Sequence, residues 1–201
     1  MKDEIKNNIN KDYAKYKWFF TSSEKLVIGG KNASQNDQLL KKIKSLGGEY
    51  IIMHTSQPGS PFSVILSDIK SISSTDIGEC AIFTACFSQS WKSGKRKARV
   101  DIFNSSQINK SSSMKVGTWG VKGKVKKMEV NLELVLTVQK GILRSVPEKT
   151  IKNKGKILLK ILPGNKNKEE LLSEIHASLK ERFSKNDILS ALPSGGLQLL
   201  K

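Results

Sequence analysis

Apolar residues in the first third of this chain are gathered in short blocks that favour strands joined by tight turns. Residues 16–20 and 25–28 are rich in aromatic and branched side chains around a Thr-Ser-Ser turn, so they predict a hairpin. Residues 50–54 and 62–66 predict two further strands, because a Pro-Gly-Ser-Pro turn separates them. The first third of the chain is therefore expected to contribute strands to a sheet.

Two segments carry apolar residues at helical spacing. The first is expected to be capped by Asn36-Asp37 and to end at Gly47-Gly48. The second is expected to begin near residues 74–76 and to run to about Trp91, with Trp91 in its buried stripe. Its two cysteines, at positions 80 and 86, fall on different helix faces, so we expect two small buried thiols and neither a disulfide nor a zinc site.

A two-residue alternation follows the second helix. Three apolar side chains are expected to face a core, and they are Ala98, Val100 and Ile102. The polar side chains between them are expected to face outward, and they are Lys97, Arg99 and Asp101. A second alternation is expected to place Trp119, Val121 and Val125 on one strand face and Lys122, Lys124 and Lys126 on the other. Residues 130–138 are expected to continue as a buried strand.

The pattern changes again after Pro147. Residues 156–162 predict a strand that ends in a Pro-Gly-Asn turn. Asn167 and Glu170 form a capping pair for a helix expected to reach Phe183, and residues 187–192 predict a further helical turn. The fold class that these elements predict is α+β, with a mixed, mainly antiparallel sheet of five or six strands, two packed helices and a small C-terminal β-α appendage.

We expect three parts along the chain. A polar, flexible arm is expected at 1–13, the main domain at 14–144 and the small C-terminal domain at 145–201. A chain of 201 residues is long enough for one domain of about 150 residues and an appendage.

Charge changes this picture, because it is concentrated in two segments, and the second, residues 140–168, holds nine lysines and arginines against the single acid Glu148. The net charge is +17, and residues 92–127 hold eleven lysines and arginines against the single acid Asp101. A strand spaces alternate side chains about 6.6–7 Å apart, which is close to the phosphate spacing of an extended nucleic-acid strand. Such a concentration of positive charge predicts a polyanionic partner, and nucleic acid is the commonest polyanion in cells.

Other classes of protein have little support in the residues. No apolar run approaches the length of a membrane span, and the N-terminus is too polar for a secretory signal, so we expect a cytoplasmic protein without a membrane partner. The glycine-rich stretches lack the spacing of a phosphate-binding loop. His54 and His176 lie in separate segments and suggest no metal site. We therefore expect no cofactor.

Several motifs, taken in order, resemble one known family. The first is Trp18-Phe19-x-x-Ser22-x-Glu24-x-Leu26-Val27-Ile28-Gly29-Gly30-Lys31-Asn32-Ala33-x-x-Asn36. His54 follows with Pro58-Gly59-Ser60-Pro61-Phe62, then Ser90-Trp91, Gln107-x-x-Lys110 and Gly117-Thr118-Trp119-x-Val121-Lys122-Gly123-Lys124. Over residues 14–130 this order resembles the NFACT-R domain, the RNA-binding module of the NFACT ribosome-quality-control factors, often described as fibronectin-binding.

The resemblance implies a function and also has limits. It implies binding to ribosomal or transfer RNA, with the large ribosomal subunit as a partner, and it does not imply the tailing activity of the complete factors. The chain is shorter than those factors, so we expect a stand-alone form. Family members commonly have an aromatic residue before the histidine and an aspartate soon after it. Met53 and the Thr-Ser-Gln at 55–57 replace them here, which weakens a polar role for His54.

The candidate nucleic-acid-binding residues combine the charge pattern with these motifs. They are Lys92, Lys95, Arg96, Lys97, Arg99, Lys110, Lys115, Trp119, Lys122, Lys124, Lys126, Lys127 and His54. Trp119 can stack on a base or belong to the core, whereas Trp91 is expected in the core. His54 can bind a ribose or phosphate, or be structural. The chain is not expected to be an enzyme; an RNA-modifying enzyme and a DNA-binding protein are the alternatives, since charge alone does not distinguish RNA from DNA. The oligomeric state is left open.

Overall fold

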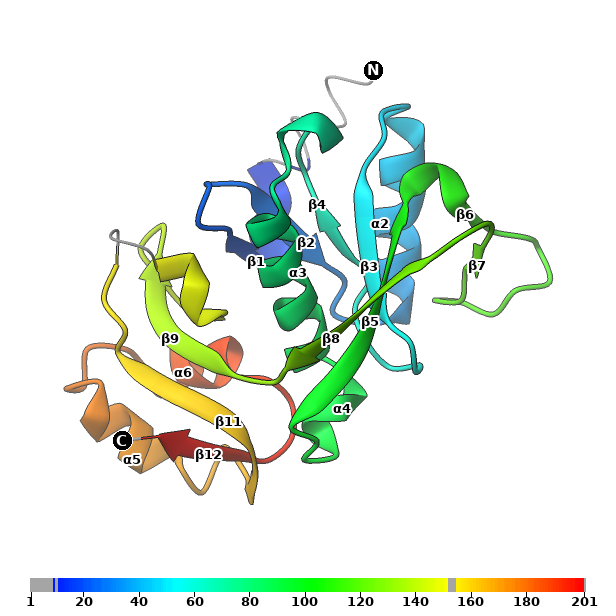
Figure 1. The fold of residues 1–201 in the computed structure, drawn as a ribbon. Coiled ribbons are helices and arrows are strands. Elements are labelled where there is room, and N and C mark those ends of the chain that lie inside the picture. Colours follow the sequence, from blue (N-terminus) through cyan, green and yellow to red (C-terminus); the bar gives the residue numbers. More distant parts are fainter. Residues whose placement is uncertain (1–8, 10, 152–154, 201) are drawn as a thin grey trace.

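Among the residues that the computed structural model describes, which are 9, 11–151 and 155–200, six strands form the larger sheet (Figure 1). Their order is β1-β2-β4-β3-β5-β8, and neighbours pair antiparallel. The strands are β1 (Lys17–Phe20), β2 (Leu26–Gly29), β3 (Ile51–Thr55), β4 (Ser63–Ile65), β5 (Lys97–Asn104) and β8 (Lys126–Asn131). The predicted hairpin and the α+β class are confirmed.

Each face of this sheet packs against one long helix. The helices are α2 (Ala33–Ser45) and α3 (Ser74–Cys86). Successive side chains of a strand point to opposite faces, so Trp18 packs with the leucines of α2 while Phe19 packs against Phe83 of α3. The sheet is therefore buried on both sides over most of its area.

The first helix begins earlier than the sequence pattern suggested. Its N-cap is Asn32, whose side chain accepts a hydrogen bond from the Gln35 backbone N–H at 2.9 Å. The expected cap, Asn36-Asp37, was wrong. Both residues lie inside the helix and are buried. Since Asn32 already caps the helix, Asn36 and Asp37 are free to bind other parts of the chain.

The second helix ends earlier than predicted. Ser73 caps α3 in a reciprocal pair with Asp76. The helix stops at Cys86, and Ser88 caps a separate short helix, α4 (Gln89–Lys92). The single helix expected to reach Trp91 was therefore wrong, although Trp91 is fully buried as predicted. Both cysteines are free thiols in the core, as expected.

The single strand expected at 130–138 is divided between two sheets. Pairing with β5 ends at Asn131, because β5 itself begins at the opposite residue, Lys97. The chain then enters a second antiparallel sheet through β9 (Leu134–Gln139). Among the described residues this sheet has four strands in the order β10-β9-β11-β12, and its other members are β10 (Ile142–Val146), β11 (Leu159–Lys166) and β12 (Leu197–Leu200).

Two details of the C-terminal region differ from the prediction. The expected turn at Pro163 is a bulge within β11, where both Pro163 and Lys166 pair with Leu197. The helix expected to reach Phe183 is α5 (Leu172–Ser178), which ends before Lys180 and Glu181 because both have positive φ. A further helix, α6 (Lys185–Ala191), follows. Both helices lie beside the second sheet (Figure 1).

Side chains of the second sheet bind the edge strand of the first. The Gln139 side chain donates to the Phe20 carbonyl at 2.8 Å and accepts from the Phe20 N–H at 2.9 Å. The Arg144 guanidinium donates to the Trp18 carbonyl and lies over the Trp18 ring. One cluster of buried residues includes members of both sheets. The sequence placed a domain boundary near residue 145, whereas the chain enters the second sheet at Leu134; the division into domains stays a prediction.

The remaining elements are short. They are the two-stranded sheet of β6 (Ile108–Asn109) and β7 (Gly120–Val121) and the turns η1 (Tyr13–Lys15), η2 (Ile69–Ser71), η3 (Ser105–Gln107) and η4 (Glu148–Ile151). Most of the expected arm at 1–13 lies outside the described residues; Ile9 is buried, and Tyr13 packs edge-on against Trp18. In the described part of the chain, no helix has the length and hydropathy to cross a membrane.

Candidate nucleic-acid interface

The predicted alternation on β5 is present in the structure. Ala98, Val100 and Ile102 are buried, while Lys97 and Arg99 are exposed. The outward side chains of this strand are held at fixed spacing because β5 pairs with β3 on one side and β8 on the other. We call the outward side of β5 and β8, which carries Lys97 and Arg99, the strand face.

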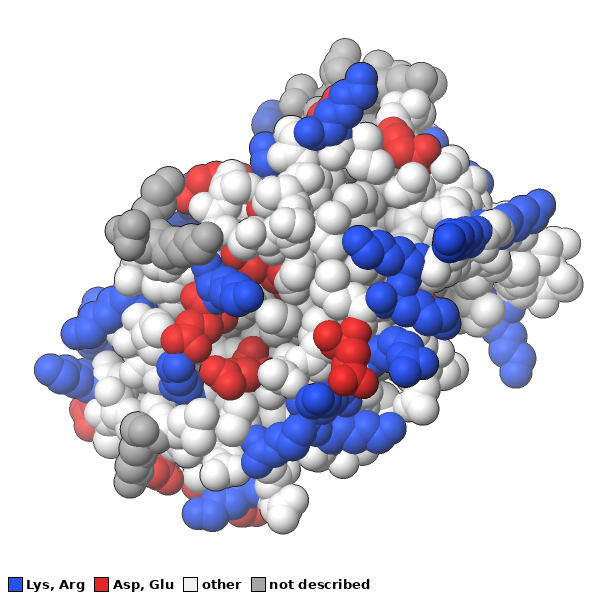
Figure 2. All heavy atoms as spheres, in the orientation of Figure 1, with Lys and Arg blue, Asp and Glu red and all other residues white. Residues whose placement is uncertain are grey.

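Acidic side chains share this face with the bases. The register places Glu129 opposite Arg99 and Lys127 opposite Asp101. Lys97 lies 3.4 Å from Glu129, and Lys127 lies 3.4 Å from Asp101. Exposed pairs of this kind contribute little stability. The basic residues along β5 and β8 are visible in Figure 2 with acidic residues between them. The face is therefore less basic than the charge count of residues 92–127 suggests, because β8 pairs with β5 and places Glu129 on it.

The second predicted alternation, with lysines at 122, 124 and 126 on one strand face, was wrong. Strand β7 ends at Val121, which is exposed, and the next strand starts at Lys126. Between them Gly123 has positive φ, and the Gln107 side-chain NH₂ donates to the carbonyls of Lys122 and Lys124 at 2.9 Å. Those two lysines therefore lie in an exposed loop and do not continue the strand face.

The other predicted bases occupy several environments. Lys92, Lys95, Arg96 and Lys115 are exposed on loops or at the end of α4. Lys95 donates to the Gln57 side chain at 3.2 Å, next to the strand face.

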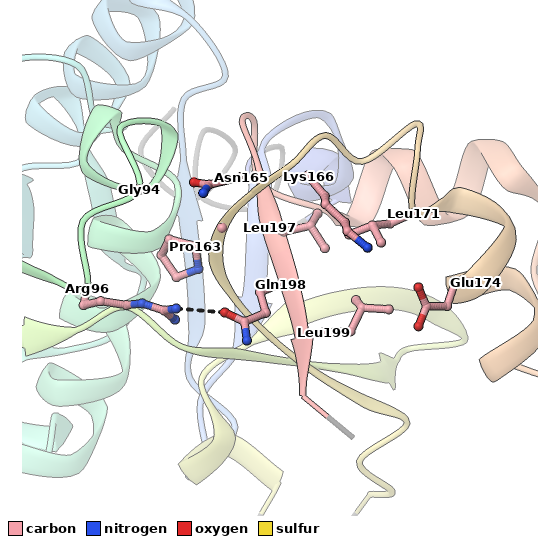
Figure 3. A pocket seen from close by; sticks show the side chains of 11 residues that line it. Gly94, Arg96, Pro163, Asn165, Lys166, Leu171, Glu174, Leu197, Gln198 and Leu199 are labelled. Atoms are coloured by element: carbon pink, nitrogen blue, oxygen red, sulfur yellow. Dashed lines mark hydrogen bonds between the residues drawn. The ribbon is translucent and has the colours of Figure 1, made fainter.

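Arg96 points toward the C-terminal sheet. It donates to Gln198 at 2.9 Å beside a cavity of about 350 Å³ that also contains Asn165, Lys166 and Glu174 (Figure 3).

Lys110 is not on the outer surface. Its ammonium group lies 3.1 Å from Asp37 and donates to the carbonyls of Lys115 and Thr118. The Trp119 indole N–H donates to the same carboxylate at 2.8 Å, and so does the Gly117 N–H at 3.0 Å. Burial alone would raise the pKa of Asp37, but the three donors lower it below its ordinary value. This network fixes the 110–119 segment on α2 and buries Trp119.

A cavity of about 520 Å³ lies at one end of the larger sheet. Strands β2 and β3 end there, β1 and β4 begin there, and α2 starts at its rim. We call it the pole cavity. Its aromatic walls are Phe62, Phe87, Phe103 and Trp119. Its polar and charged residues include Lys17, Lys31, Asn36, His54, Thr118 and Asp101.

Three sequence motifs that lie far apart in the chain meet at this cavity. Residues 30–33, 58–62 and 116–119 all line it. Gly30 permits the closest approach, because a Cβ there would lie 2.2 Å from the Asn36 side-chain oxygen. That oxygen accepts the Phe62 N–H at 3.1 Å and so joins the first two motifs. The close backbone packing at Gly30 thus helps to form the cavity.

His54 is half-buried at the wall of the cavity. Its ring lies on the ring of Phe62, with centroids 4.4 Å apart. Nδ1 is 2.7 Å from the Thr55 carbonyl and must carry the proton there, so Nε2 of the neutral ring can accept a hydrogen bond. Burial lowers the pKa of His54, and the Thr55 carbonyl and Asp101 only partly oppose this effect. The ring is therefore an uncharged acceptor at neutral pH.

Two lysines supply positive charge to the cavity. Lys31 is exposed at its rim. Lys17 lies with its ammonium group 4.7 Å from the centroid of the Phe87 ring. Burial is the main cause that lowers the pKa of Lys17 to about 8, and the charges of Arg144, Lys31 and Lys168 add to it. An anion bound beside Lys17 would relieve this cost.

The pole cavity lies next to the strand face. Thr55 and Ser56 line both the cavity and a smaller hollow of about 280 Å³, whose charged residues are Lys95, Lys97, Arg99 and Glu129. Ser56 also donates to the Asp101 carboxylate at 2.5 Å. The hollow and the cavity are therefore neighbours on the protein surface.

The sequence analysis named His54 and Trp119, which line the cavity, but did not name Lys17, Lys31 or Asn36 as candidates, although they line it too. Lys17 stands in an apolar strand, and Asn36 was read as a helix cap. The signal that could have found the last two was their place within the motif from Gly29 to Asn36, which lines the cavity.

The sequence and the fold of this chain are similar to those of known proteins. The sequence profile described as the NFACT protein RNA binding domain matches residues 15–123. The archaeal Rqc2 homolog aRqcH of Methanocaldococcus jannaschii is 26% identical over 98% of this chain. The chain spans only 31% of the length of that relative. The C-terminal part of the fibronectin/fibrinogen-binding protein from Streptococcus suis has a similar fold, with a TM-score of 0.50 and 22% identity over 58% of this chain and 45% of the other.

Proposed function

Because this chain belongs to the family of NFACT RNA-binding domains, we propose that it binds RNA along the strand face and at the pole cavity. The observation that carries the proposal is that the hollow lined by Lys95, Lys97 and Arg99 shares Thr55 and Ser56 with the cavity. Bases at fixed spacing can contact consecutive phosphates, and these contacts supply most of the affinity for a nucleic-acid backbone.

We infer that the RNA is ribosomal or transfer RNA engaged in ribosome quality control. The similarity to the archaeal Rqc2 homolog supports this inference. The tailing activity of complete factors is not part of the proposal, since the chain covers 31% of that relative. Sequencing RNA crosslinked to the protein in cells tests it: enrichment of ribosomal or transfer RNA is expected, and a spread over unrelated transcripts would contradict it.

Filter binding across a salt series tests the role of the strand face. Affinity for single-stranded RNA is expected to fall by about 0.7 log units per phosphate contact for each tenfold rise in salt. The double variant Lys95→Glu/Arg99→Glu should bind more weakly and with a shallower slope, since two contacts are lost. The same charge change at exposed positions on α2, Lys41→Glu/Lys42→Glu, is the matched control and should leave the slope nearly unchanged.

Two results would point to another function, and a third would point to another binding surface. If duplex DNA competes as well as structured RNA, the strand face recognises phosphates without regard to the sugar. If the mass of the RNA changes after incubation and this change is lost in His54→Ala, the protein is an RNA-modifying enzyme. If affinity survives the double charge reversal, the RNA lies on another surface.

A further inference from the structure

We propose that the pole cavity receives one unpaired nucleotide of the bound RNA, with its base against His54 and the rims of Phe62 and Trp119 and its phosphate toward Lys17 and Lys31. This inference rests on the proposed RNA binding and assigns a second kind of contact to it. The strand face then recognises the backbone, whereas the cavity distinguishes unpaired from paired RNA.

The size and walls of the cavity suit a nucleobase. Its volume of about 520 Å³ falls within the range of about 300–1,000 Å³ that is typical of small-molecule pockets. Four aromatic side chains and His54 line it. Unpaired bases in RNA are commonly recognised by contact with such rings, and bases within a helix are not accessible to them.

The polar groups of the cavity match a nucleotide. His54 offers an acceptor at Nε2 to a ribose hydroxyl, as argued from its Nδ1 contact with Thr55. Asn36 is only 7% exposed, and its oxygen is engaged by Phe62, so its NH₂ group can donate to a base or sugar oxygen. These groups sit among apolar walls, where a hydrogen bond is stronger than in water.

The charges of the cavity favour an anion. Lys17 and Lys31 are at its wall, and the N-terminus of α2 lies there. The Gln35 N–H already donates to the Asn32 side chain, and the N–H groups before it point out of the helix. Asp101 is the one acid among the described residues that line the cavity. Its carboxylate already accepts from Ser56 and lies 3.4 Å from Lys127. A phosphate group near Lys17 therefore meets little repulsion.

The shape of the cavity does not depend on a ligand. Gly117 has positive φ, and a Cβ there would lie 2.7 Å from Ala33, so the 116–119 wall is closely packed on the start of α2. The bonds from Lys110, Gly117 and Trp119 to Asp37 hold the same wall from behind. A site fixed in this way loses little entropy when it binds a ligand.

A short RNA duplex with one bulged 2-aminopurine nucleotide tests the proposal, with the same duplex carrying a paired 2-aminopurine as the comparison. The full chain is expected to bind the bulged duplex roughly tenfold more tightly, a ratio within the range that base stacking gives. The fluorescence of the bulged base should change on binding. His54→Ala should reduce the preference, and His176→Ala, at the other histidine of the chain, should not.

Further variants distinguish the loss of a contact with the nucleotide from unfolding of the protein. His54→Phe keeps a ring at this position and should restore part of the preference. Lys17→Met should weaken binding of the bulged duplex more than the paired one, whereas Lys25→Met, at another half-buried lysine of the same hairpin, should not. Circular dichroism checks that each variant melts near the unmodified protein.

The outcomes distinguish the two proposals. If neither duplex binds, the proposed function fails and this inference fails with it. If both duplexes bind equally, with the usual salt dependence and no change in fluorescence, the inference is overturned and the proposed function stands. If free 2-aminopurine riboside monophosphate binds as tightly as the bulged duplex, the cavity is a mononucleotide site, and its assignment to RNA is overturned.

Discussion

Asp37 accepts hydrogen bonds from three separate parts of the 110–119 segment. Lys110 is half-buried beside it, with 18% of its side chain exposed. The carboxylate joins this segment to α2 through its ion pair with Lys110, and it also accepts from Trp119 and Gly117. At the residue scale, the wall of the pole cavity thus depends on a carboxylate that carries no part of the proposed contact with RNA.

Replacing Asp37 with alanine should reduce the free energy of unfolding by about 2–4 kcal/mol, because Lys110 would keep its burial and lose its counter-charge. Urea denaturation measures this loss. Glu129→Gln, which removes an exposed partner of Lys97, is the matched control and should cost less than about 1 kcal/mol. Equal losses in the two variants would show that the buried pair contributes no more than an exposed one.

The same carboxylate predicts a dependence on pH. The folded protein lowers the pKa of Asp37, so the unfolded chain binds more protons in the acidic range. The stability that Asp37 contributes is complete above its unfolded pKa of about 3.9 and is lost as the pH falls through the folded value. Asp37→Asn should therefore lose less stability between neutral and acidic pH than the unmodified protein.

At the scale of elements, the start of α2 is closely packed against the chain around it. Gly30 lies against Asn36, which binds the segment before β4 through the Phe62 N–H. Helix α3 has a glycine in a different setting, because a Cβ at Gly78 would have no neighbour within 4 Å. The two glycines therefore have opposite expected responses to the same substitution.

Gly30→Ala should destabilise the protein, since the new methyl group displaces Asn36 and with it the bond to Phe62. Gly78→Ala should stabilise it by about 0.5–1 kcal/mol, because alanine loses less backbone entropy in a helix. Thermal melting of both variants checks the pair. A loss of stability in Gly78→Ala would contradict the open surroundings of that position.

At the scale of the whole molecule, the two sheets are joined by specific contacts. Arg144 and Gln139 bind the backbone of β1, and buried residues of both sheets share one cluster. We expect a single cooperative unfolding transition, in which the calorimetric and van't Hoff enthalpies agree. Two resolved transitions would show that the second sheet unfolds independently, as the sequence-based division near residue 145 implies.

The sequence by itself determined the features that depend on neighbours along the chain. The β1–β2 hairpin, the alternation around Val100 and the buried cysteines follow from local spacing, because a strand or helix repeats every two or 3.6 residues. Helix boundaries were less well determined, since Asn32 and Asn36 are both good caps and tertiary contacts decided between them.

Only the tertiary structure decided which distant residues meet. Glu129 lies beside Lys97, Lys110 turns inward to Asp37, and Lys122 leaves the strand face. The pole cavity combines residues from Lys17 to Val121, and no local period relates them. Periodicity gives the direction of a side chain from its own element, whereas a site depends on how several elements are placed, which strand pairing and core packing determine.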